Sequence, residues 1–396
     1  MPSQTPDSCY NLREIPHTIL IIGKSEERKI YMLFQIYGST SGTQLLGWLM
    51  VFVGLIVLNE IARQTKAGGI AIFGVILGLL TVYFIAVHLG AFGGPENQTY
   101  KYMDGWFHYF KLYAASIGCI GFMMIKYGWG IGKKDWFKPF PFAIVAANIL
   151  IAVVSDLESA LNAYKVTGDL SGAWWASIEG VFIYGGWWNL LNAIAGLINI
   201  FCMTSWWGIY SSKDKKDMLW PDMTIWFIIA YDVWNFEYTY LSLPTHAWYC
   251  GVALLLAPTF ANAIWNKGGW IQNRANTLAI WCMFAQVFPL FQLSKKFSVL
   301  PTVYGGAGEL GISALDIYDK AIEVFNSGVN TSNEVIAEMG ITANPVAQGV
   351  LAIAALAANV ICIAVIIKRA KAQKINPYKQ DVFAGTRDFE EAMARK

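Results

Sequence analysis

Long apolar stretches recur along this chain, and they constrain its fold more than any other feature of the sequence. Each stretch holds about 20 predominantly apolar residues, which is the length an α-helix needs to cross about 30 Å of hydrocarbon. A membrane β-barrel would instead show alternating strands of about 10 residues. The sequence therefore predicts an all-α, polytopic transmembrane helix bundle of about nine spans. The predicted spans are residues 43–62, 69–91, 106–127, 139–159, 188–210, 221–244, 246–266, 274–294 and 346–367.

The composition supports a chain whose main partner is the lipid bilayer. Charged residues make up 14% of the 396 residues, whereas a soluble domain usually carries about 25%. The net charge of +2 leaves no electrostatic footprint for nucleic acid. The six cysteines contain no Cys-x-x-Cys pair, so neither a metal site nor a disulfide framework is predicted. No motif identifies a cofactor or an oligomeric state.

Basic residues are concentrated in alternate loops between the predicted spans, and this pattern sets the orientation of the bundle. The cytoplasmic loops of membrane proteins carry the excess of Lys and Arg. The N-terminus is therefore predicted outside, and residues 368–396 are predicted to form a basic cytoplasmic tail. We expect the membrane to be a bacterial cytoplasmic membrane. The basic residues of the other cytoplasmic loops are Arg63, Lys66, Lys133, Lys134, Lys138, Lys213, Lys215, Lys216, Lys267 and Arg274.

Residues 1–42 form an N-terminal tail that departs from this charge pattern. Residues 1–31 carry four basic side chains on the side that is predicted to be outside. They also lack the layout of a signal peptide. The codons for the Glu-Glu-Arg-Lys run at residues 26–29 would be purine-rich, as a bacterial ribosome-binding site is. We therefore hypothesise that translation starts at Met32.

Two segments outside the spans are expected to be structured. Residues 160–187 are rich in Gly and Trp, and either an interfacial helix or a re-entrant segment would fit them. Residues 295–345 are predicted to form an external loop with two short amphipathic helices. The first helix follows Ser313, and its apolar face is Leu315, Tyr318, Ile322 and Phe325. Thr331 and Glu334 match a capping box for the second helix, and Gly340 matches its end.

Three consecutive predicted spans carry a polar stripe along one helical face. In lipid these groups would lack hydrogen-bond partners, so each stripe should turn toward the interior of the bundle. The stripes therefore predict a shared polar seam, although Ser and Thr in such positions commonly serve only to join helices. The stripes are Asn148, Ser155, Ser159 and Asn162; Asn189, Asn192, Gly196 and Asn199; and Thr224, Asp232, Asn235, Thr239 and Ser242.

Asp232 lies at the midpoint of its predicted span and is the strongest candidate for a functional residue. A charged side chain at the bilayer centre costs about 2.5–3.5 kcal/mol or more, so such residues usually have a function. Glu237 points almost opposite to Asp232 and lies about 7.5 Å nearer the outer face. Asp156 and Glu158 end their span near the outer surface, where simple solvation would also explain them. The candidate residues for a solute, ion or proton site are Asp232, Asn235, Asn192, Asn148, Glu237, Asp156 and His88.

A transporter or channel for a small solute, an ion or a proton is the favoured function. Pro258 and Pro289 interrupt two spans beside polar side chains, as in the discontinuous helices of transporters. The chain has no Gly-x-x-x-x-Gly-Lys-Ser/Thr motif, so it is no self-contained ATP-driven pump.

Two alternatives of other classes remain open. The first is an intramembrane enzyme that acts on a lipid-linked substrate, with His88, His108 and Asp156 as acid–base groups. The second is a structural or assembly subunit that docks through residues 295–345. A transporter is favoured over an enzyme.

Overall fold

The computed structural model describes residues 33–36, 38–103, 107–329 and 331–396. The translation start hypothesised at Met32, and the residues before it, lie outside this part of the chain. The described chain is mostly helical, and its three sheets each contain two short antiparallel strands.

Each predicted span contains a helix. These helices are α2 (Ser41–Gln64); α3 (Lys66–Ile70), the π-helix η2 (Ala71–Ile76) and α4 (Leu77–His88); α6 (Phe107–Tyr127); α7 (Phe140–Thr167); α8 (Trp187–Phe201); α9 (Ile225–Ser242); the π-helix η7 (Trp248–Ala253) and α10 (Leu254–Ile264); α11 (Trp270–Val287) and α12 (Pro289–Leu293); and α16 (Pro345–Gln373). Pro289 begins α12 after a break that follows Val287.

Short elements connect these helices. The strands are β1 (Phe34–Gln35) paired with β6 (Leu300–Pro301), β2 (Ala173–Ala176) with β3 (Phe182–Gly185), and β4 (Tyr210–Ser211) with β5 (Met218–Leu219). The helices are α5 (Gln98–Tyr102), α13 (Ala307–Leu310), α14 (Ala314–Ser327), α15 (Asn333–Glu338) and α17 (Arg387–Met393). Short 3₁₀ segments are η1 (Gly38–Thr40), η3 (Ala91–Glu96, kinked at residues 92–94), η4 (Gly130–Lys133), η5 (Asp135–Phe137) and η6 (Pro244–His246).

Four helical segments are long and apolar enough to cross a membrane: α2, Lys66–His88, Asp135–Thr167 and α16. The surface of α16 shows why. Val350 and Ile353 are more than half exposed, whereas Ala352 and Ala355 are fully buried where α16 packs against α8 and α9. A broad apolar face of this kind is a liability in water and a suitable surface in lipid. Small residues at the buried face let the helices approach closely. The four segments therefore indicate a membrane protein.

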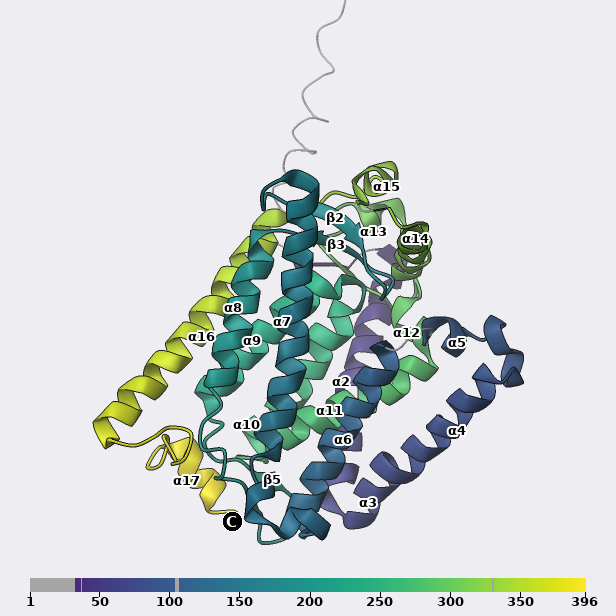
Figure 1. Ribbon diagram of the computed structural model, residues 1–396. Helices are drawn as coiled ribbons and strands as arrows, with labels where there is room; N and C mark the ends of the chain where they lie inside the picture. Colours follow the sequence, from purple (N-terminus) through teal and green to yellow (C-terminus); the bar gives the residue numbers. More distant parts are fainter. Residues whose placement is uncertain (1–32, 37, 104–106, 330) are drawn as a thin grey trace, which may run out of the picture.

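The two ends of the bundle carry different structures (Figure 1). The β2–β3 hairpin and α13–α15 lie at one end, called here the hairpin end, and α17 and the C-terminus lie at the other, called here the tail end. Loops that were predicted to be cytoplasmic meet at the tail end. Arg63 Nη1 lies 2.9 Å from Asp217 Oδ1, and Lys267 Nζ lies 3.0 Å from Asp388 Oδ1.

Residues 160–187 contain the end of a helix and a β-hairpin, so the interfacial helix considered from the sequence was wrong. Helix α7 continues to Thr167, and the chain then turns into the β2–β3 hairpin. The hairpin strands are rich in aromatic and branched residues, which favour a strand over a helix. Gly180 provides the positive φ (+69°) that the turn needs.

Gly185 in β3 packs so closely on α7 that a side chain has no room. A Cβ atom there would lie 2.2 Å from the backbone oxygen of Ser159. Gly185→Ala should therefore lower the free energy of unfolding by about 1–3 kcal/mol, the usual cost of overpacking. The tryptophan fluorescence of the purified protein during thermal unfolding measures the change. Gly78→Ala is the control, because no atom lies within 4 Å of its added Cβ; equal melting of both variants would contradict the prediction.

The loop 295–345 contains the two predicted helices, α14 and α15, but two details of the prediction were wrong. Helix α14 begins after Ser313, whose hydroxyl accepts a hydrogen bond from Asp316 N at 3.3 Å. Its buried face is Ala314, Ile317, Ala321 and Val324, one position before each predicted residue, and Phe325 is exposed. The small alanines allow α14 to lie closer to the bundle than the larger predicted residues would.

The capping box predicted for α15 does not form. The N-cap residue is Ser332, whose side chain makes no capping hydrogen bond, and the Thr331 hydroxyl accepts from Asn333 N at 3.3 Å instead of from Glu334. Gly340 ends the helix as predicted, with φ +71° and a hydrogen bond from Ile341 N to Ile336 O at 3.1 Å.

The C-terminal tail folds back onto the bundle. Backbone N–H groups of Val382 and Phe383 donate to the Asp222 carboxylate at 3.1 and 2.8 Å, and the Thr204 hydroxyl donates at 2.5 Å. The predicted basic tail is therefore packed against the tail end of the bundle.

Candidate functional site

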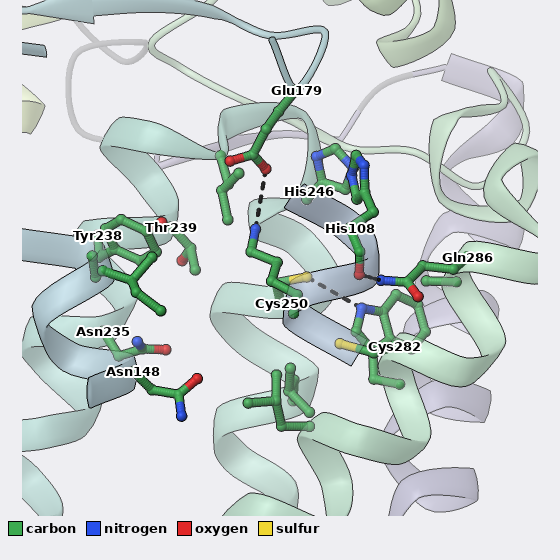
Figure 2. Close-up of a pocket in the computed structure, with 18 of the residues that line it drawn as sticks. His108, Asn148, Glu179, Asn235, Tyr238, Thr239, His246, Cys250, Cys282 and Gln286 are labelled. Carbon is green, nitrogen blue, oxygen red and sulfur yellow. Dashed lines mark hydrogen bonds and ion pairs between the residues drawn. The ribbon is translucent and has the colours of Figure 1, made fainter. Parts of the chain in front are cut away.

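A cavity of about 150 Å³ lies inside the bundle and is the strongest candidate for a functional site (Figure 2). Residues of α6, α7, α9, η7 and α11 line it, and the β2–β3 hairpin contributes Glu179. Helix α9 contributes Tyr231, Trp234, Asn235, Tyr238 and Thr239, and α11 contributes Arg274, Leu278, Trp281, Cys282, Ala285 and Gln286. Spacings of three and four place each set on one helical face.

The cavity is elongated. Arg274 and Gln286 both line it from the same helix, α11. At about 1.5 Å of rise per residue, their positions are about 18 Å apart along the helix axis. The cavity therefore follows α11 for several turns as a narrow space.

An ion pair lies where the hairpin meets the cavity. Lys111 Nζ of α6 lies 3.1 Å from Glu179 Oε2, and Figure 2 shows Glu179 reaching down from the hairpin toward it. Their side chains are 30% and 12% exposed, so the pair is largely shielded from water. Burial raises the pKa of the Glu179 carboxyl, and Lys111 opposes that shift. This ion pair therefore links the hairpin to α6.

His108 and His246 lie close to this ion pair (Figure 2). His246 Nε2 lies 2.9 Å from the Tyr102 hydroxyl, which also accepts a hydrogen bond from Gln292 Nε2 at 3.2 Å. Gln286 Nε2 donates to the backbone oxygen of His108 at 2.9 Å. The side-chain oxygens of both glutamines have no hydrogen-bond partner among the described residues. This part of the cavity therefore offers acceptors to a ligand.

Arg274 is the second cationic residue of the cavity, nearer its other end. Its Nη2 donates to Asn235 Oδ1 at 3.3 Å, and its Cζ lies 5.7 Å from the centre of the Tyr231 ring. Nε and Nη1 are buried and find no hydrogen-bond partner in the described part of the chain. The cavity thus has hydrogen-bond donors near one end and acceptors near the other.

Two of the seven candidate residues from the sequence, Asn148 and Asn235, line the cavity. Asn148 Nδ2 donates to Ile144 O at 2.7 Å within its own helix. Asn235 accepts from Arg274. They come from α7 and α9, two of the three spans that were predicted to share a polar seam.

Asp156 and Asn192 lie together outside the cavity. Asn189 Nδ2, Asn192 Nδ2 and Ser242 Oγ donate to the Asp156 carboxylate at 3.0, 2.8 and 3.2 Å. Because Asp156 is fully buried, simple solvation at the rim does not describe it, whereas Glu158 is exposed. The contacts join α7, α8 and α9 and bring together stripe residues of α8 and α9, while α7 contributes Asp156, which lies outside its predicted stripe.

Glu237, Asp232 and His88 lie in three further environments. Glu237 is fully buried, and neither carboxylate oxygen has a hydrogen-bond partner among the residues described. Asp232 is half-buried and accepts from Thr259 Oγ1 of α10 at 2.6 Å. His88 Nε2 lies 2.6 Å from the Tyr109 hydroxyl, at an exposed position. The structure therefore separates the seven candidates instead of gathering them into one site.

The groups assigned to the alternative enzyme are also apart. His108 lines the cavity, Asp156 lies in the buried cluster between α7, α8 and α9, and His88 is exposed beside Tyr109. No group of three or more His, Cys, Asp or Glu side chains suited to a metal ion occurs within the described residues.

Arg274 is the cavity residue that the sequence analysis misplaced. It was counted as a loop residue because the apolar window begins at 274, yet α11 begins at Trp270 and Arg274 lies in its second turn. The Gly268–Gly269 pair was the available signal, since such pairs mark turns immediately before an element. Gly268 has a φ of +80° in the structure.

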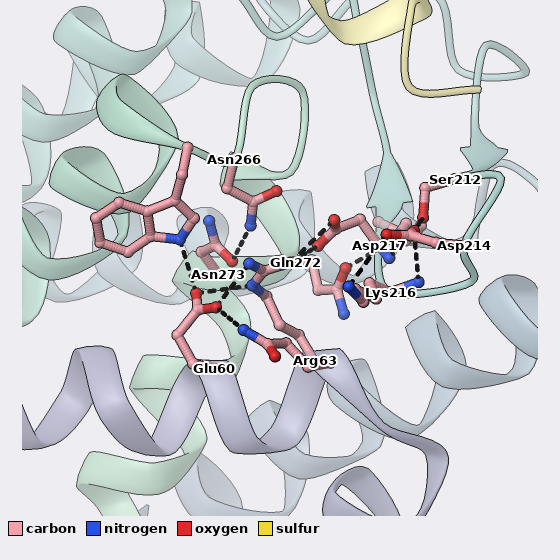
Figure 3. Close-up of polar contacts among 12 residues, drawn as sticks. Glu60, Arg63, Ser212, Asp214, Lys216, Asp217, Asn266, Gln272 and Asn273 are labelled. Atoms are coloured by element: carbon pink, nitrogen blue, oxygen red, sulfur yellow. Dashed lines mark hydrogen bonds and ion pairs between the residues drawn. The ribbon is translucent and has the colours of Figure 1, made fainter.

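A polar cluster at the tail end includes an ion pair within α2 (Figure 3). Glu60 and Arg63 are three residues apart, a spacing that favours pairing on a helix, and Arg63 Nη2 lies 2.6 Å from Glu60 Oε2. The sequence did not indicate the further partner, Asp217, whose carboxylate accepts hydrogen bonds from both Arg63 and Arg395. Asp217 is fully buried, so this cluster joins α2, the β4–β5 hairpin and the C-terminal tail.

Comparisons with curated proteins and with solved structures each found no match. A protein-family profile described as "Family of unknown function (DUF5692)" matches residues 38–395, which include every residue that lines the cavity. The chain therefore belongs to the family of unknown function DUF5692.

Proposed function

We propose that this protein is a transporter for a small polar solute, and that the solute passes through the cavity along α9 and α11. The observation that carries the proposal is the combination of an elongated cavity with unpaired polar atoms inside a lipid-facing helical bundle. Polar groups are costly inside a membrane and usually line substrate pathways there. The proposed topology has nine spans in a bacterial cytoplasmic membrane, with the tail end in the cytoplasm.

The hairpin end of the cavity has features that alternating access requires, namely a gate and interrupted helices. At the hairpin end, the Lys111–Glu179 pair joins the β2–β3 hairpin to α6, and we assign it the role of an outer gate. The break between α11 and α12 after Val287, and the π-helix η7 that carries Cys250, lie beside the same end. Discontinuous helices near a midplane site are common in transporters, and π-helical turns often occur at functional sites.

Asp232 is proposed as the residue that binds a coupling cation or carries a proton. Its Oδ2 accepts from Thr259, and its Oδ1 is buried with no hydrogen-bond partner in the described structure. It lies three positions before Asn235, one of the cavity residues. A change in its charge would therefore act close to Arg274 and the solute.

Filling the cavity should stop transport. Ala152 of α7 lines the cavity, whereas Ala147 of the same helix is exposed on the outer surface. Ala152→Phe should abolish flux, because the ring occupies the narrow path, and Ala147→Phe should leave the flux unchanged. The flux is measured by light scattering of proteoliposomes after a sudden increase in the external concentration of glycine, glycerol or sodium methanesulfonate.

Wild-type protein should accelerate the flux of at least one of these probes over that of empty liposomes. The proposal fails if none is accelerated, or if the two phenylalanine variants transport equally. A thermal melt of each variant checks that Ala152→Phe still folds.

A further inference from the structure

We infer that the solute of the central cavity carries an anionic group and that Arg274 is the residue that binds this group. The inference rests on the proposed function, since it names the chemical class of the solute. Arg274 is only 8% exposed, and it lines both the central cavity and a neighbouring cavity of about 40 Å³. It therefore stands between two internal spaces, in contact with both.

The guanidinium of Arg274 has fewer partners than a buried cation requires. Its one hydrogen bond goes to Asn235 Oδ1, a neutral acceptor at 3.3 Å. Nε and Nη1 have no partner in the part of the chain that the structure describes. Leaving a buried donor unsatisfied costs about 1–3 kcal/mol, and more when the group is charged. A bound anion would remove this cost.

The acidic residues near the cavity make no direct ion pair or hydrogen bond with Arg274 in the described structure. Glu179 forms the ion pair with Lys111 at the hairpin end. Asp232 accepts from Thr259 at 2.6 Å and makes no hydrogen bond to Arg274 in the described structure. Arg274 is therefore the one Lys or Arg among the described lining residues whose charge no carboxylate pairs with directly.

The shape of the site selects a compact, soluble anion. A carboxylate or sulfonate presents two oxygens to the planar fork of a guanidinium, which is a strong arrangement. The cavity volume of about 150 Å³ resembles that of an engineered cavity that holds benzene. Tyr231, Trp234 and Leu278 supply apolar walls around Arg274 for a short carbon chain. A lipid with two acyl chains would not fit inside.

The test compares anions with neutral molecules of the same size. The full-length protein in phosphatidylcholine nanodiscs is titrated with acetate against acetamide, and with methanesulfonate against dimethyl sulfone. Saturation-transfer NMR on the methyl protons reports weak binding. We expect each anion to bind about tenfold more tightly than its neutral counterpart, because a hydrogen bond to a charged group typically changes the affinity by this factor.

Variants assign the preference to a residue. Arg274→Gln should remove it, Arg274→Lys should retain part of it, and Arg387→Gln, on an exposed helix at the tail end, should leave it intact. The wild-type comparison needs no variant, so a folding defect in Arg274→Gln does not prevent the test.

Three results would overturn the inference. They are equal binding of anionic and neutral probes, anion binding by Arg274→Gln at wild-type strength, and loss of anion binding in phosphatidylglycerol nanodiscs, which would assign the site to a lipid headgroup. If the first of these occurs while Ala152→Phe still blocks glycerol flux and Ala147→Phe does not, the proposed transport function stands and only the anionic class of the solute is wrong.

Discussion

Replacing Asp217 with alanine should lower the free energy of unfolding by about 3–5 kcal/mol, the usual cost of removing one partner from a buried ion pair. Both Asp217 oxygens accept from Arg63 Nη1, at 2.9 and 3.0 Å, and Arg395 also donates to Oδ2. Arg63 is 5% exposed, so its charge would stay buried and lose one of its two carboxylates. The C-terminal tail would also lose the contact that Arg395 makes.

Denaturation of the purified protein by sodium dodecyl sulfate, followed by tryptophan fluorescence, measures this loss. Asp135→Ala is the matched control, because Asp135 is 88% exposed and its pair with Lys138 is solvated. That variant should unfold like the wild type. Asp217→Asn should fall between the two, since it keeps an acceptor oxygen and loses the charge. An Asp217→Ala protein as stable as the control would show that the cluster does not support the fold.

Removing the Asp156 side chain should also destabilise the protein strongly. Asp156→Ala leaves the amides of Asn189 and Asn192 and the hydroxyl of Ser242 without their acceptor, in a site with no exposure to solvent. Each buried donor left unsatisfied costs about 1–3 kcal/mol, so a total loss of about 3 kcal/mol or more is expected. The same denaturation assay measures it.

Glu158→Ala is the control for Asp156→Ala, because Glu158 lies two residues later on α7 and is exposed. It should unfold at the wild-type midpoint. Asp156→Asn tests the role of charge. The amide keeps one acceptor oxygen for part of the three donors, and its N–H₂ group faces the rest. Wild-type stability in Asp156→Ala would mean that the donors find other partners and that the cluster is not a structural junction of α7, α8 and α9.

Parts of the fold that depend on local patterns were predictable. The apolar runs located a helix in every predicted span, and the pairing of Glu60 with Arg63 followed from their spacing of three. Gly340 ended α15 because a left-handed residue suits a helix end. The polar stripes of α8 and α9 indicated buried faces, and their residues Asn189, Asn192 and Ser242 meet at Asp156.

Other features were outside the reach of such patterns. The buried face of α14 is displaced by one residue from the predicted face, because alanines that are weakly hydrophobic pack better than the larger residues beside them. The hairpin in residues 160–187 was missed because a short strand is stabilised by its partner strand, which hydropathy does not reveal.

The sequence by itself determined that this chain is a helical membrane protein with polar faces turned inward. The reason is that backbone and side-chain polar groups in lipid must find hydrogen-bond partners within the protein, while the surface that faces lipid must be apolar. Only the tertiary structure decided which polar residues share a site. Arg274, Lys111 and Glu179 come from two helices and a hairpin that are far apart in the chain, and Arg274 lies in a turn of α11 that apolar content did not reveal. Contacts between distant segments follow from packing geometry, and no local pattern records them.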